Sequence, residues 1–100
     1  MKIIQITAVP SQTLNSNLGG QNCKISIYQK STGVFLDLSV ANIPIVVGML
    51  CLDRVSLVRH AYLGFVGSLV FCDTQGVSDP TYDGLGVRYL LGYLEPTDKN

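Results

Sequence analysis

Short runs of alternating apolar and polar residues dominate the chain, and turn residues separate them at roughly ten-residue intervals. The clearest run is 34–40, where every second residue is aliphatic. Successive side chains of a strand point to opposite faces of its sheet, so a period of two predicts strands. Six to eight such segments and at most one helical turn predict an all-β fold, either a small antiparallel β-barrel or a β-sandwich.

Individual strands are expected at residues 2–8, 12–18, 23–27, 34–40, 45–47, 67–73 and 87–95. The turn stretches "GGQN", "KSTG" and "ANIP" join the middle strands as hairpins, because glycine and asparagine accept a positive φ. The strand at 45–47 has apolar neighbours on both sides, which predicts a central strand buried on both faces. Residues 53–59 alternate less cleanly, so a strand and a turn of helix both stay open there.

Length and charge limit the number of domains and the classes of partner. One hundred residues predict one β domain over 1–100, with a polar tail at 96–100 that frays. Seven basic and seven acidic residues are scattered singly, so there is no basic stripe for nucleic acid. With 14% charged and 47% hydrophobic residues, the surface is expected to be buried against partner chains.

No segment is expected to enter a membrane. The start "MKIIQITAVPSQ" lacks the long apolar region of a signal peptide and is interpreted as a strand. The longest apolar run ends at Asp53 and Arg54, well short of the roughly 20 residues of a membrane span. The protein is therefore expected to be made in a cytoplasm.

The sequence holds little chemistry. Cys23, Cys51 and Cys72 form no C-x-x-C pair and lie in apolar runs, which predicts reduced, buried cysteines. The single histidine, His60, has only Cys51 or Cys72 as a possible partner, and nothing in the sequence places them together. We therefore expect no enzymatic activity, no catalytic residue, no cofactor and no metal site.

The stretch "DTQGVSDPTYDGLG" at 73–86 is the best candidate for a ligand site. Its aspartates are six and four residues apart with no following glutamate, which fails the EF-hand pattern, and "GLG" fails the phosphate-loop pattern. Each aspartate has a turn role available, accepting hydrogen bonds from nearby amides. The loop is thus predicted to be a preordered connection that exposes Pro80 and Tyr82 to a neighbouring subunit.

A second unusual stretch is "HAYLGFVG" at 60–67, where two glycines interrupt large apolar residues. Burial in the core and contact with a partner are equally compatible with this pattern. The residues expected to form an interface come from both stretches: Tyr62, Leu63, Phe65, Val66, Pro80, Tyr82 and Leu85.

Three blocks in this order carry a resemblance: "GGQNCKISIYQKSTGVFLDL", "CLDRVSLVRHAYLGFVGSLVFCDTQG" and "DPTYDGLGVRYLLGYLE". Together they resemble the small baseplate plug proteins of contractile-tailed bacteriophages, a family typified by the plug of a cyanophage baseplate. The resemblance covers residues 2–95. It implies a β-rich structural protein of the virion, without enzymatic activity, located in the tail baseplate.

The implied position is near the tail axis, where the protein plugs the distal tail tube and joins it to the central hub and spike. Tube, hub and spike proteins are then the expected partners, contacted through sheet edges and apolar loops, with strand addition as one mode. Self-association in a three- or six-fold arrangement is expected from the symmetry of a tail.

Two other functions remain open. A small β-sandwich that recognises carbohydrate at a host surface would use exposed aromatic side chains, for which Tyr82, Tyr89 and Tyr93 are the candidates. A Cys/His enzyme or cysteine-based redox protein would need a reactive thiol.

Overall fold

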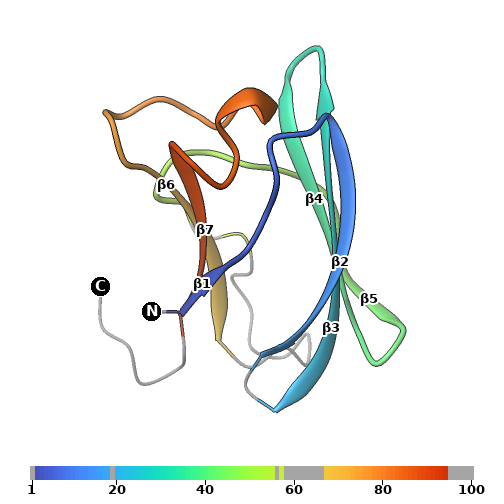
Figure 1. The fold of residues 1–100 in the computed structure, drawn as a ribbon. Coiled ribbons are helices and arrows are strands. Elements are labelled where there is room, and N and C mark those ends of the chain that lie inside the picture. The colour runs from blue at the N-terminus through green and yellow to red at the C-terminus, as the bar shows by residue number, and fades with distance from the viewer. Residues whose placement is uncertain (1, 19, 56, 58–66, 95–100) are drawn as a thin grey trace.

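The computed structural model describes residues 2–18, 20–55, 57 and 67–94, and these form a sandwich of two antiparallel sheets (Figure 1). One sheet follows chain order: β2 (Ser11–Leu18), β3 (Gln21–Lys30), β4 (Gly33–Val40) and β5 (Ile43–Leu50). The other has the order β1 (Lys2–Ile4), β7 (Tyr89–Leu94) and β6 (Ser68–Asp73). The all-β prediction is confirmed, and the open sheet edges identify the sandwich rather than a closed barrel.

The only helical element among the described residues is the 3-10 turn η2 (Tyr82–Gly84). The strand pattern predicted at most one helical turn, and the described residues contain one. No helix in this part of the chain is long and apolar enough to cross a membrane.

The predicted hairpins are confirmed. Leu14 pairs with Ile25, and Ile25 in turn pairs with Leu38, so one inward row of side chains crosses three strands. The turn from β4 to β5 places Ala41 and Asn42 at φ values of 51° and 66°. Positive φ at both central residues gives the turn a twist that matches the strands on either side.

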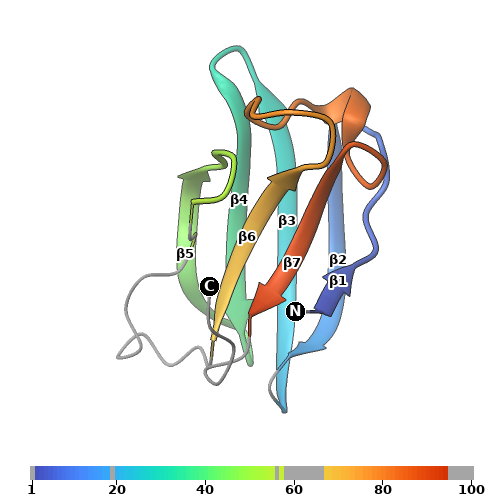
Figure 2. The ribbon, with the colours of Figure 1, turned by 90° about the vertical axis from the view of Figure 1, so that its left-hand side faces the viewer.

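The core lies between the two sheets (Figure 2). The aliphatic residues that alternate along β4 are all buried, as their spacing predicted, and Phe71 and Leu91 of the smaller sheet belong to the same buried cluster. The largest side chains that are almost completely buried are Tyr93, Phe71, Leu18, Ile25, Ile27, Leu36, Leu38, Leu69, Leu85, Leu91 and Val34.

The prediction of a central, doubly buried strand at 45–47 is wrong. β5 is the last strand of its sheet, with β4 as its only neighbour among the described strands. Ile43 is 63% exposed and Val47 is 74% exposed, one on each face. Apolar neighbours in sequence do not determine a strand's place in the sheet, whereas Pro44 at the start of β5 fits an edge.

Two strands are shorter than predicted. β1 ends at Ile4 instead of residue 8, because the side-chain amide of Gln12 is hydrogen-bonded to both the N–H and the carbonyl of Thr7. The Thr7 N–H donates to Gln12 Oε1 at 3.0 Å, and Gln12 Nε2 donates to the Thr7 carbonyl at 2.6 Å. At the other end of the chain β7 begins at Tyr89, while Val87 is 75% exposed in the preceding turn.

Part of the undecided segment at 53–59 lies along the edge of β6. The Arg54 N–H donates to the Phe71 carbonyl at 2.7 Å, and the Leu57 N–H donates to the Leu69 carbonyl at 2.8 Å. Asp53 forms a parallel bridge with Phe71. The expected frayed tail at 96–100 is outside the described residues.

Truncating the core of β4 should destabilise the fold strongly. Leu38 has no exposed surface, so Leu38→Ala leaves a cavity and should lower the free energy of unfolding by about 2–5 kcal/mol in urea titrations. Val47→Ala on the exposed β5 is the matched control and should change the free energy of unfolding by less than about 0.5 kcal/mol. Equal losses in the two variants would contradict the assignment of β4 as core and β5 as edge.

Candidate functional site

The loop that connects β6 to β7 is organised by one buried ion pair. Asp73 ends β6, and its side chain has no exposed surface. Arg88 directly precedes β7, and its side chain is 34% exposed. Arg88 donates from Nε to Asp73 Oδ1 and from Nη2 to Asp73 Oδ2, both at 2.9 Å. This two-point pairing fixes the distance and the orientation between the two ends of the loop.

Backbone amides complete the surroundings of the same carboxylate. The Gln75 N–H donates to Asp73 Oδ1 at 2.9 Å, and the Ser78 N–H donates to Asp73 Oδ2 at 2.8 Å. The hydrogen bonds from Arg88 and, to a smaller extent, those from Gln75 and Ser78 hold the pKa of Asp73 well below its ordinary value. The turn role predicted for this aspartate is therefore confirmed.

Neighbouring charges extend the network. Asp53 Oδ1 accepts a hydrogen bond from the Asp73 N–H at 2.7 Å, and Asp79 Oδ1 accepts one from the Asp53 N–H at 3.0 Å. Arg54 donates to the carbonyls of Asp73 and Gly76. The aspartates thus engage donors of the chain itself, and in the described part of the chain no three His, Cys, Asp or Glu side chains are grouped to hold a metal ion.

The tip of the loop, at η2, is attached to other parts of the fold. The Tyr82 N–H donates to Gln29 Oε1 on β3 at 3.0 Å. Gly86, with φ of 82°, lies directly against the backbone of Ile6, where any side chain would collide. Because the tip is bonded to β3 and packs against the segment between β1 and β2, it presents Tyr82, which is 39% exposed, from a fixed position.

The predicted interface residues fall into three groups. Tyr82 is exposed as expected, but Pro80 is buried, so the expectation of an exposed proline is wrong. Leu85 is 1% exposed and belongs to the core, because the loop folds back between the sheets. The residues Tyr62, Leu63, Phe65 and Val66 lie outside the described part of the chain.

Sequence reasoning missed two features of the loop. The first is Arg88, the partner of Asp73, which no local motif indicates because the two residues are far apart in sequence. The second is Val77, which is 83% exposed. Its polar and glycine neighbours in the sequence were the available signal for this exposure.

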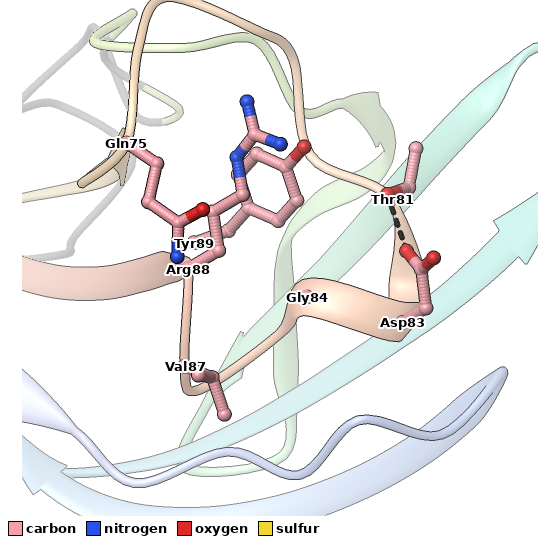
Figure 3. A pocket seen from close by; sticks show the side chains of 7 residues that line it. All are labelled: Gln75, Thr81, Asp83, Gly84, Val87, Arg88 and Tyr89. Carbon is pink, nitrogen blue, oxygen red and sulfur yellow. Dashed lines mark hydrogen bonds between the residues drawn. The ribbon is translucent and has the colours of Figure 1, made fainter.

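A depression of about 340 Å³ lies beside the loop. Figure 3 shows the residues that line it: Gln75, Thr81, Asp83, Gly84, Val87, Arg88 and Tyr89. The Arg88 guanidinium lies 5.1 Å from the centre of the Tyr89 ring and is already paired with Asp73. Thr81 Oγ1 donates to Asp83 Oδ1 at 2.6 Å. Arg88, Thr81 and Asp83 are thus already hydrogen-bonded within the chain, which makes the depression a feature of the loop's own structure.

The cysteines test the hypothesis of a Cys/His enzyme or redox protein, and the tyrosines test the hypothesis of carbohydrate binding. Cys23 and Cys51 are buried, Cys72 is only half-buried, and all three are free. Burial raises the pKa of the Cys51 thiol to about 12, which keeps it protonated and unreactive near neutral pH. Tyr89 is 4% exposed and Tyr93 is 1% exposed, so the three tyrosines do not form a platform for carbohydrate. His60 lies outside the described residues.

Comparison with known families gives one assignment. The family described as "Cyanophage baseplate Pam3 plug gp18" matches residues 1–96. Comparison with the curated proteins finds no match.

Removing the charge of Asp73 should destabilise the protein in a pH-dependent way. A lowered folded-state pKa stabilises the fold above the ordinary aspartate pKa of about 3.9, and this contribution is lost as the pH falls below that value. Asp73→Asn should therefore melt several degrees below the wild type at neutral pH, and the difference should shrink in acid. Asp83→Asn, at an exposed position, is the control for which we expect little change. A difference that stays constant with pH would contradict the role of the ion pair.

Thiol alkylation should distinguish the three cysteines. In the native protein Cys72 should react first, because it is half-buried, while Cys51 and Cys23 should be protected by burial and raised pKa values. Mass spectrometry of digested, labelled protein measures each site, and denatured protein, in which all three should react, is the control. Fast labelling of Cys51 in the native state would support a reactive thiol instead.

Proposed function

The chain belongs to the cyanophage baseplate Pam3 plug gp18 family, and from this membership we propose that it plugs the distal tail tube and joins it to the central hub and spike. As a family member it is a structural protein of the phage virion, located in the tail baseplate, where it interacts with other baseplate components. The observation that carries the finer proposal is the family match, which extends over nearly the whole chain.

The proposed mechanism is binding alone, without catalysis. The loop after β6 supports it, since the Asp73–Arg88 pair and the Tyr82–Gln29 bond order the loop before any partner arrives. A surface that is already ordered loses less conformational entropy on association. Tyr82 is a suitable anchor because tyrosine is enriched among the residues that dominate binding energy.

Symmetry sets the expected arrangement of copies. Subunits that encircle a tail axis are related by rotation about it, and we propose a three- or six-fold ring of this chain at the end of the tube. Low charge supports a role with extensive contacts, because only 14% of residues are charged.

Binding to the tube, hub and spike should depend on Tyr82. With the recombinant tail tube, hub and spike proteins of the same phage as probes, Tyr82→Ala should weaken the complex at least about tenfold, through loss of a partly exposed anchor. Asn15→Ala, on the outward face of β2, is the control and should bind like the wild type. Titration calorimetry measures the affinity, and light scattering measures the number of copies. A chain that stays monomeric and binds none of the three proteins would contradict the proposed function.

A further inference from the structure

The stretch 74–79, in the first half of the loop after β6, contributes no side chain to the core. Every residue in it is exposed, and Val77, its single aliphatic residue, is 83% exposed. The conformation of the stretch therefore depends on hydrogen bonds. Segments that bury little apolar surface open locally at a lower cost in free energy than the core of a fold.

One group of these hydrogen bonds belongs to the two ends of the loop. The carboxylate of Asp73 accepts from the amides of Gln75 and Ser78. The Thr74 N–H donates to the Arg88 carbonyl at 2.8 Å. These bonds attach the stretch to the ends of β6 and β7, which both belong to the smaller sheet.

A second group comes from the segment that follows β5 and crosses from the larger sheet to the edge of β6 (Figure 1). The Arg54 guanidinium donates to the carbonyls of Asp73 at 3.2 Å and Gly76 at 3.3 Å. The Asp53 N–H donates to Asp79 Oδ1 at 3.0 Å, and Asp53 Oδ1 accepts from the Asp73 N–H at 2.7 Å. Two adjacent residues from outside the loop thus hold the stretch near its beginning, its middle and its end.

The backbone of Arg54 has an unfavourable conformation. Its φ is 58°, in the left-handed region that residues other than glycine, asparagine and aspartate rarely adopt. The Arg54 N–H donates to the Phe71 carbonyl at 2.7 Å, and its guanidinium pairs with the Asp53 carboxylate. A strained residue persists only where the surrounding structure offsets its cost, and the two side-chain bonds to the loop are part of that structure here.

We propose that Asp53 and Arg54 form a latch that controls the order of the stretch 74–79. With the latch closed, as in this structure, the stretch is attached to the segment after β5, and Val77 is held in one position. With the latch open, the stretch leaves that segment while the Asp73–Arg88 pair and the sandwich stay intact. The latch lies at the surface, since the Arg54 side chain is 54% exposed. A connection from the larger sheet thus determines the order of a surface on the smaller one.

Residue-resolved hydrogen exchange of the isolated wild-type chain is the first test, and it needs no partner protein. Local opening exposes little new surface, so urea changes it little, whereas global unfolding depends strongly on urea. At low urea concentrations, the amides of Asp53 and Ser78 should therefore exchange at nearly constant rates. The slowest amides of β3 and β4 should exchange faster as urea is added. Because no partner is involved, the result does not depend on the proposed function.

The variant Arg54→Gly opens the latch without adding strain. Glycine adopts a positive φ freely, so relief of the backbone strain offsets the lost side-chain bonds, and the variant should melt within a few degrees of the wild type. The amides of Asp53 and Ser78 should exchange at least about tenfold faster, while amides of β3 and β4 keep their rates. Lys24→Ala, which removes an exposed positive charge from β3, is the control and should leave the amides of Asp53 and Ser78 unchanged.

Each outcome decides the matter. Faster exchange that is confined to the loop and to Asp53 in Arg54→Gly supports the latch. Faster exchange by the same factor in the loop and in β3 and β4 overturns it, because Arg54 then serves the stability of the whole fold. Unchanged exchange at Ser78 also overturns it, as does a wild-type Ser78 amide whose rate follows urea like those of the core.

Discussion

The arrangement of the loop between the sheets depends on the buried carboxylate of Asp73. A charge with no exposed surface is costly unless its oxygens are hydrogen-bonded, and here both oxygens are, by Arg88 and by two backbone amides. Because Asp73 ends β6 and Arg88 precedes β7, the pair joins the two longest strands of the smaller sheet where the chain leaves and re-enters it. These bonds restrict the conformations that the loop between the two strands can adopt.

A second constraint on the sandwich is the unpaired backbone at the edges of its sheets. Two stacked open sheets have four edges, and each exposes backbone donors and acceptors. In this fold the residues after β5 run beside β6 and donate to its carbonyls, so one of the connections that link the sheets also covers an edge. β5 differs because the chain turns away after Leu50 toward the edge of β6. The open edge is thus a consequence of the topology as much as of the sequence of the strand.

The sequence pattern correctly predicted the strands and turns that depend on neighbouring residues alone. Alternation at 34–40 and the turn "ANIP" specify β4 and its hairpin without reference to the rest of the chain. The errors arise where tertiary contacts decide. Pro80 is buried because the loop folds back over the core. β1 ends early because the side chain of Gln12 forms hydrogen bonds with the backbone of Thr7. Likewise, the partner of Asp73 is fifteen residues away, which no motif reveals.

Charged side chains stabilise both the loop after β6 and the bulge in β5. Only 14% of the residues are charged, and several of them are engaged inside the fold. Asp73 and Arg88 order the loop, Asp53 and Arg54 lie beside β6, and Asp37 closes the bulge in β5. Fewer charges therefore remain for the surface than the composition suggests, and solubility depends on surface charge. With these ionic groups placed in loops and beside a bulge, the strands β2 and β5 contain no charged side chain, so the uncharged stretches of the fold are concentrated on the larger sheet.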